Sequence, residues 1–200
     1  MADINEIQKR LIEAGFMPAP KPATVLSTPA EPAVPPSDSE KEYMKMAEQD
    51  APHVERLRNR FARSSKRYGV PVEVLAGIAS RESRGGKALN EFGYDDAKEA
   101  FGILQVDKRF HKLQGTQAPD SQEHIDQGAS ILKQYHEVIK KKHPKWSEEM
   151  QWRGAVAAYN MGPGNVKSVE NLDIGTTGND YSQDVMLRAK VYRDRWSKKK

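Results

Sequence analysis

One carboxylic acid, Glu82, follows a strongly apolar stretch of the chain, and this position could give it unusual acid–base chemistry. Residues 72–79 are almost wholly apolar, so we expect a buried helix that ends at Gly85 and Gly86. At the last turn of such a helix the dipole presents its negative pole, and the apolar surroundings remove solvent. Both effects favour the protonated form of the carboxyl group. A carboxyl group that keeps its proton near neutral pH can protonate a glycosidic oxygen as a general acid.

The neighbours of Glu82 suggest a more ordinary role. Arg81 and Arg84 flank it, so an ion pair at a solvated helix end would also account for the glutamate. Position alone favours this ion pair. The longer motifs around Glu82 favour the chemical role.

Five sequence blocks give that role its context. They read, in order, AGIASRES, GYDD, FGILQVDKRFHKLQGT, WRGAVAAYNMGPGNV and LDIGTTGNDYSQDVMLRAKVY. In this order the blocks resemble the goose-type lysozymes, over roughly residues 50–193. The resemblance implies a mainly α, lysozyme-like domain with a small non-helical or β segment at the floor of its cleft. It also implies cleavage of the β-1,4 bond between N-acetylmuramic acid and N-acetylglucosamine in bacterial peptidoglycan.

The resemblance assigns three catalytic positions. Glu82 matches the general acid, and Asp107, in FGILQVD, matches an aspartate that places the attacking water in a single-displacement, inverting reaction. The other family aspartate follows Gly-Trp-Gly, where this chain has GYDD. Matching the glycine and tyrosine of GYDD to the family's glycine and tryptophan assigns the role to Asp96, which is our prediction. Counting forward from Glu82 assigns it to Asp95 instead, and an aspartate in a glycine-rich loop could also simply cap a turn.

A further group of residues matches family positions that line the sugar-binding cleft. Aromatic rings and amides suit this task, because sugars offer apolar faces rimmed by hydroxyl and N-acetyl groups. Tyr159 lies in an alanine-rich helical pattern and could instead be packed in the core. The predicted sugar-binding residues are Gln105, His111, Tyr159, Asn160 and Tyr181.

Two other functions fit parts of the pattern. Lytic transglycosylases resemble this fold and share a glutamate followed by serine, a Gly-x-x-Gln segment and Ala-Tyr-Asn, but they leave 1,6-anhydromuramic acid ends. The additional aspartates and the segment DIGTTGNDY favour hydrolysis, because a water-activating base is needed only if water attacks. A non-catalytic wall-binding protein is the second alternative, and the intact Glu82 argues against it.

The composition changes along the chain and predicts three parts. Residues 1–16 predict a short amphipathic helix, and its segment IQKRLIEAGF resembles the first helix of peptidoglycan-binding modules. Residues 17–38 contain seven of the twelve prolines and predict a linker. The catalytic domain is expected over residues 39–200, starting with a capping box of Ser39 and Glu42.

The pattern of residues 39–200 is helical nearly throughout. Pro52 suits the first turn of one helix, which we expect to end at Gly69. The helical period fails between residues 89 and 106, where a short strand or ordered loop is expected at 101–106. Further helices are expected at 71–84, 120–143, 147–160 and from about 180 to the terminal lysines.

Composition limits the possible partners. The chain has no cysteine and no His-Glu-x-x-His spacing, so we expect no metal and no cofactor. The net charge of +4 would attract polyanions, but no aromatic and basic module predicts a nucleic-acid partner. The sequence has no apolar run of about 18 residues, so we expect no membrane insertion. Nothing in the sequence requires more than a monomer. The N-terminus does not resemble a secretory signal, so the route to a wall in the periplasm or outside the cell is open.

Overall fold

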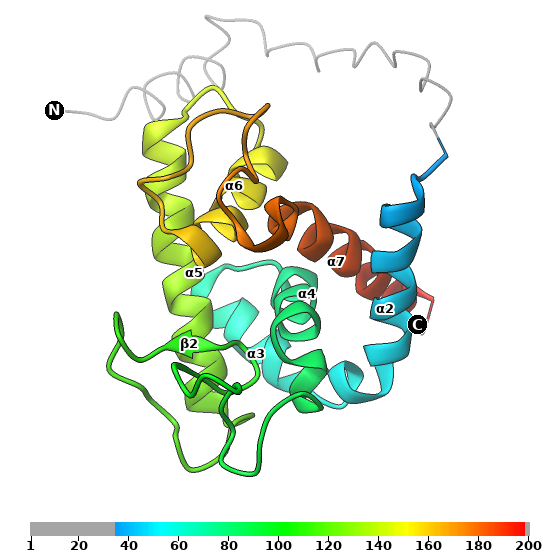
Figure 1. Ribbon diagram of the computed structural model, residues 1–200, viewed down its shortest axis with the longest axis vertical. Coiled ribbons are helices and arrows are strands. Elements are labelled where there is room, and N and C mark those ends of the chain that lie inside the picture. Colours follow the sequence, from blue (N-terminus) through cyan, green and yellow to red (C-terminus); the bar gives the residue numbers. More distant parts are fainter. Residues whose placement is uncertain (1–34, 199–200) are drawn as a thin grey trace, which may run out of the picture. The chain divides into compact units, whose positions relative to one another are not determined.

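The computed structural model describes residues 35–198, and these form a mainly α fold (Figure 1). The predicted helix at 1–16 and most of the linker lie outside the described residues. The helices are α2 (Asp38–Glu55), α3 (Arg58–Tyr68), α4 (Val72–Ser83), α5 (Gln122–Lys142), α6 (Glu148–Met161) and α7 (Tyr181–Ser197). Short strands β1 (Ala100–Phe101) and β2 (Val106–Asp107) pair antiparallel, and 3-10 turns η1 (Arg84–Gly86) and η2 (Thr177–Asn179) complete the order. The predicted mainly α fold with a small β segment is confirmed.

The first described helix begins earlier than its predicted capping box. Ser37 is the N-cap of α2, with its hydroxyl accepting from the Glu40 amide and the Glu40 carboxylate accepting from the Ser37 amide. Ser37 and Glu40 have the same spacing as Ser39 and Glu42, so the sequence motif was found two residues too late. Pro52 also lies inside α2 rather than in a first turn, and the helix ends three residues after it.

The apolar helix α4 lies at the centre of the core, as its sequence predicts. It contacts α2, α3 and α7, and Figure 1 shows it surrounded by the other helices. Leu75, Ala76, Ile78 and Ala79 are at most 1% exposed. None of the helices within residues 35–198 has the length and apolar character that crossing a bilayer requires.

A glycine lets α4 and α7 touch at their closest contact. A Cβ atom on Gly77 would lie 2.6 Å from the Val185 carbonyl oxygen and 3.1 Å from the Ala189 nitrogen. Both neighbours are backbone atoms of a helix, so they cannot rotate aside. The helix α4, which carries Glu82, and the helix α7, which begins at Tyr181, can therefore lie this close only because residue 77 has no side chain.

We expect Gly77→Ala to destabilise the protein by about 1–3 kcal/mol, because the added methyl group forces the two helices apart. Alanine favours helix formation by about 1 kcal/mol over glycine, so a net loss isolates the packing effect. Gly164→Ala is the matched control, since a Cβ atom there has no neighbour within 4 Å. Thermal unfolding of the two variants measures the difference, and equal stability would show that the contact is not tight.

The segment between η1 and α5 carries the two strands and no α-helix. His124 of α5 holds this segment in place, because its Nε2 accepts the Leu104 amide at 3.2 Å. Burial lowers the pKa of His124 to about 4, so the imidazole is neutral at pH 7 and can accept this bond. Gly102, with φ +75°, leaves room for the ring, since a Cβ atom there would lie 2.3 Å from Nε2. The loop that follows β1 is thus anchored to a helix of the core.

Candidate active site

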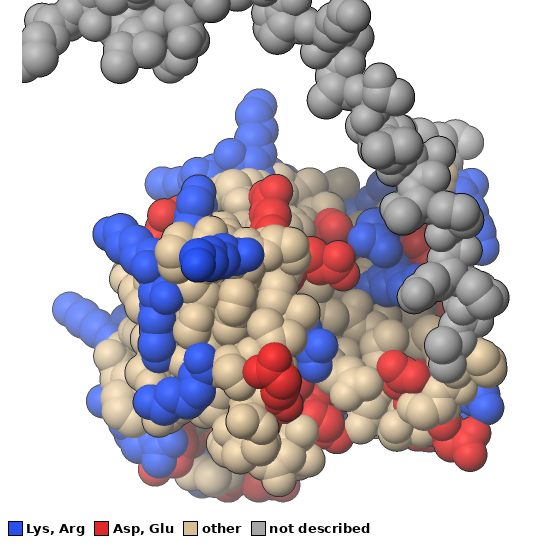
Figure 2. Space-filling model, turned by 90° about the horizontal axis from the view of Figure 1, so that it is seen from above, with Lys and Arg blue, Asp and Glu red and all other residues tan. Residues whose placement is uncertain are grey.

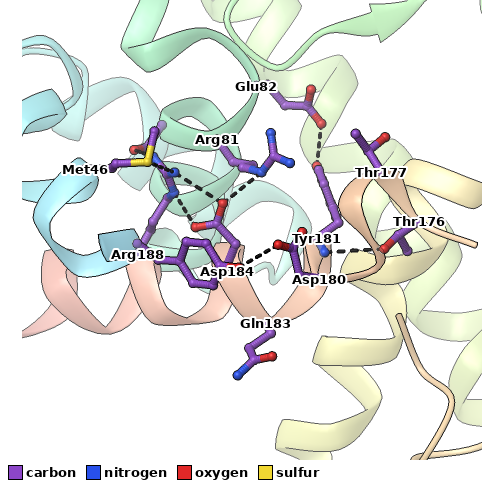
Figure 3. Close-up of polar contacts among 12 residues, drawn as sticks. Met46, Arg81, Glu82, Thr176, Thr177, Asp180, Tyr181, Gln183, Asp184 and Arg188 are labelled. Carbon is purple, nitrogen blue, oxygen red and sulfur yellow. Dashed lines mark hydrogen bonds and ion pairs between the residues drawn. The ribbon is translucent and has the colours of Figure 1, made fainter. Parts of the chain in front are cut away.

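Glu82 lies in the last turn of α4, partly buried, where its carboxyl group meets α7. The Tyr181 hydroxyl donates a hydrogen bond to Glu82 Oε1 (Figure 3). Burial raises the pKa of Glu82 to about 7, and the charge of Asp95 acts in the same direction. The hydrogen bond from Tyr181 and the charge of Arg81 lower the pKa and only partly offset the burial. Glu82 therefore keeps its proton on a substantial fraction of molecules at neutral pH.

The flanking arginines bind other carboxylates. Arg81 Nε lies 2.8 Å from an oxygen of Asp184 on α7, and Arg84 Nε lies 2.8 Å from an oxygen of Asp50 on α2. Asp184 and Asp50 are both buried. The ion pair that position alone would suggest for Glu82 is therefore replaced by two others, one from α4 to α7 and one from η1 to α2.

A cleft of about 840 Å³ opens beside Glu82. Its walls come from the loop and strands that precede α5, from α5 and α6, and from the segment around η2. Six of the eight predicted site residues line it: Glu82, Gln105, Asp107, His111, Tyr159 and Asn160. Asp95, the alternative to Asp96, lines it as well. The structure thus brings together residues that are spread over about 80 positions of the chain.

The two neighbouring aspartates of GYDD have different places. Asp95 lines the cleft, and its Oδ1 accepts the amides of Glu99 and Ala100 at 3.1 and 3.3 Å. Asp96 is exposed and is not part of the cleft wall. The geometry therefore favours Asp95, the alternative reached by counting forward from Glu82, over Asp96, which the motif match preferred.

Asp107 lies on β2 and faces the cleft as half of an ion pair. Both of its oxygens contact the Arg109 guanidinium, at distances of 2.5 to 3.0 Å, and the Arg109 amide donates to Oδ1. These hydrogen bonds hold the pKa of Asp107 below its usual value. Asp107 is thus a permanent carboxylate near neutral pH, with its charge balanced by a cation that lines the same cleft.

The predicted sugar-binding residues take two kinds of position. Gln105 adopts a left-handed backbone (φ 48°), and its side-chain amide donates to the Gly102 carbonyl at 2.7 Å. The Tyr159 hydroxyl donates to the Leu104 carbonyl at 2.9 Å. Asn160 is exposed in the cleft wall, whereas Tyr181 is 1% exposed and lies behind Glu82 rather than in the wall. Tyr181 is therefore a partner of the acid, a role that its sequence position did not reveal.

Several polar residues of the cleft wall were not among the predicted ones, including Arg109, Thr176 and Thr177. Thr177 of η2 donates its amide to Asn160 Oδ1 at 2.9 Å. The signal for the two threonines was present in the segment DIGTTGNDY. Within residues 35–198, no group of three or more His, Cys, Asp or Glu side chains is placed to hold a metal ion.

Comparison with known proteins gives this arrangement a family. The model of the family described as Lysozyme g matches residues 39–195. The lysozyme g of the ostrich Struthio camelus is 43% identical over 149 residues, which cover 74% of this chain and 72% of the relative. That of Gallus gallus is 40% identical (74% and 69% covered), and that of the carp Cyprinus carpio is 41% identical (76% and 80% covered). The chain belongs to the goose-type lysozyme family.

As a goose-type lysozyme, the protein is a glycoside hydrolase. The five sequence blocks that carried the resemblance all lie within the matched residues 39–195. In this lysozyme the acid, both candidate aspartates and the predicted sugar-binding residues come from those blocks. The family match therefore covers every element that forms the cleft.

Proposed function

We propose that this lysozyme hydrolyses the β-1,4 bond between N-acetylmuramic acid and N-acetylglucosamine in peptidoglycan by a single displacement with inversion. The observation that carries the proposal is the carboxyl group of Glu82, whose pKa is raised to about 7 beside a cleft that also contains Asp95 and Asp107. A carboxyl group that keeps its proton, together with further carboxyl groups in the same cleft, is the set that acid-assisted attack by water requires. The products of wall digestion test the proposal, because hydrolysis leaves a reducing muramic acid end.

The contact with Tyr181 indicates which oxygen of Glu82 delivers the proton. The tyrosine hydroxyl donates to Oε1, so the proton of the neutral acid sits on Oε2. In the reaction Oε2 gives this proton to the glycosidic oxygen as the bond from that oxygen to the muramic acid C1 breaks. A water molecule forms the new bond to C1 from the opposite face and releases a proton to an aspartate.

We assign that aspartate as Asp95, with Asp107 helping to hold the water. Asp107 is bound on both oxygens by Arg109, which makes it a weak proton acceptor. Asp95 is fixed by backbone amides on Oδ1, and no arginine within residues 35–198 forms an ion pair with it. Asp95 is therefore the better base, and Asp107 the better fixed charge.

We expect Tyr181→Phe to move the alkaline limb of the pH profile of kcat/KM upward by about one pH unit from its starting point near pH 7. The hydroxyl stabilises the ionised form of Glu82, so its removal raises the pKa of Glu82 further. Tyr135→Phe is the control, since Tyr135 lines the same cleft without a hydrogen bond to Glu82 among the contacts of the described residues. An unchanged limb in Tyr181→Phe would show that the contact does not act on the acid.

The alternatives differ in chemistry rather than in fold. A lytic transglycosylase would need Glu82 but no water-positioning aspartate, and a wall-binding protein would need neither. The placement of Asp95 and Asp107 in the cleft supports hydrolysis over both.

The proposed partner is the peptidoglycan of the bacterial wall, which the protein attacks as a monomer, without nucleic acid and without entering a membrane. Figure 2 shows basic side chains gathered toward one side of one face, with acidic side chains between and beside them. The helix α5 ends in Lys140, Lys141 and Lys142. Such a surface favours contact with anionic wall polymers.

A further inference from the structure

Both arginines that flank Glu82 are tethered by one buried network. Its members, named here the Asp184 network, come from α2, α4, η1 and α7: Asp50, Ser80, Arg81, Arg84, Asp184 and Arg188. Asp50 and Asp184 are 0% and 3% exposed, and Arg188 is 1% exposed. These three charges are thus shielded from water and depend on their partners, whereas the side chains of Arg81 and Arg84 are 27% and 37% exposed.

Asp184 is the member that holds Arg81. Its Oδ2 lies 2.8 Å from Arg81 Nε, while its Oδ1 accepts from Arg188 Nε at 2.6 Å. Arg188 is fixed in turn by Asp50 at 3.2 Å and Ser80 at 2.9 Å. The contacts of Arg188 therefore fix the Asp184 carboxylate in position, and this carboxylate holds the Arg81 guanidinium toward α7 (Figure 3).

Arg81 would have a different effect if it were released. It precedes Glu82 in the chain, and its guanidinium carbon lies 5.6 Å from the ring centre of Tyr181, the residue that bonds Glu82. Without Asp184, the attraction between the Arg81 guanidinium, whose side chain is 27% exposed, and the carboxylate of Glu82 would no longer be opposed by a second carboxylate. A closer Arg81 would stabilise the ionised form of Glu82 and remove the proton that the reaction needs.

We propose that Asp184 is a positioning residue for the lysozyme reaction: it holds the Arg81 guanidinium against α7 and so leaves Glu82 free to carry its proton. The inference rests on the proposed role of Glu82 as general acid. Sequence position suggests an ion pair between Arg81 and Glu82. In the proposed arrangement Arg81 stays near Glu82 but pairs with the carboxylate of Asp184 instead.

Other charged and titratable groups also face Glu82, and the test must separate them from Arg81. The charge of Asp95 raises the pKa of Glu82, whereas the Tyr181 hydroxyl lowers it. Tyr159 of α6 lies close enough for the charge of Glu82 to raise the tyrosine's own pKa. None of these groups belongs to the Asp184 network. The remaining charged or titratable residues of the cleft wall are Asp107, Arg109, His111 and Tyr135.

The experiment compares Asp184→Asn with the double variant Asp184→Asn/Arg81→Met. We expect the alkaline limb of kcat/KM to fall by about one pH unit in Asp184→Asn, a loss of about tenfold above pH 7. In the double variant the alkaline limb should return to its wild-type position, because the Arg81 guanidinium that Asp184→Asn releases has been removed. Asp126→Asn is the matched control: Asp126 is 9% exposed and also pairs with an arginine, Arg67, but at the contact of α3 with α5. The alkaline limb of kcat/KM in Asp126→Asn should stay unchanged.

A ¹³C NMR titration of the Glu82 carboxyl group, assigned by its loss in Glu82→Gln, provides a readout apart from activity. A lower Glu82 pKa in Asp184→Asn that returns in the double variant supports the proposal. An unchanged pKa in folded Asp184→Asn overturns it. If the NMR pKa moves but the activity limb does not follow, the general-acid role of Glu82 fails instead. Should Asp184→Asn not fold, Arg81→Met decides: because Asp184 already holds the cation away, the Glu82 pKa should rise by less than about half a unit, and a rise of about one unit or more overturns the proposal.

Discussion

Replacing Glu82 by glutamine is expected to reduce the hydrolysis of purified peptidoglycan by about 10³-fold, because the amide has no proton of suitable acidity to give to the leaving oxygen. The side chain keeps its shape, and its carbonyl oxygen can still accept the hydrogen bond from Tyr181. The cleft should therefore bind glycan as before. The measurements are the rate of release of soluble fragments and the affinity for chitin oligosaccharides.

Glu73→Gln is the control for this substitution. Glu73 stands in the first turn of the same helix and lines a different surface hollow, remote from the aspartates of the cleft. We expect its activity to stay within about twofold of the wild type. If Glu82→Gln keeps full activity, Glu82 is not the acid. If it loses glycan binding as well as turnover, its main contribution is to the shape of the site.

Replacing Asp95 by asparagine is expected to reduce kcat by about 10²-fold, because the amide cannot take the proton of the attacking water. The change is mild for the fold, since the asparagine oxygen can still accept the Glu99 and Ala100 amides. Asp96→Asn offers a matched control one residue away, in the same loop but exposed. Its kcat should remain within about twofold of the wild type.

The pair of variants decides between the two aspartates of GYDD. A large loss in Asp96→Asn with little change in Asp95→Asn would restore the motif-based prediction and require the loop to rearrange when substrate binds. Equal and small effects in both would leave Asp107 as the base. Steady-state kinetics on a defined glycan substrate separates these outcomes, because each predicts a different order of kcat values.

Local patterns predicted the elements of the fold well. The apolar run of α4, the glycines after it and the irregular segment before α5 all have short-range causes, and the structure has each of them. Errors arose where a second candidate lay close by in the sequence. Ser37 and Ser39 both begin a capping-box spacing, and only the full set of contacts distinguishes them.

The candidate site was predictable as a set of residues but not as a set of contacts. One inserted residue between Glu82 and Phe101 left Asp95 and Asp96 ambiguous, and the choice depends on the bonds of Asp95 with the backbone around β1. Tyr181 reaches Glu82 across 99 positions of the chain. Arg81 lies beside Glu82 in sequence, yet its partner, Asp184, is more than 100 residues away. Contacts of this range follow from the packing of α4 on α7, which no local pattern encodes.

Mass spectrometry of the muropeptides released from purified wall by the wild type and by Glu82→Gln tests the central claim most directly. We expect the wild type to release fragments that end in reducing N-acetylmuramic acid, and Glu82→Gln to release almost none. Fragments that end in 1,6-anhydromuramic acid would contradict attack by water and identify the protein as a transglycosylase.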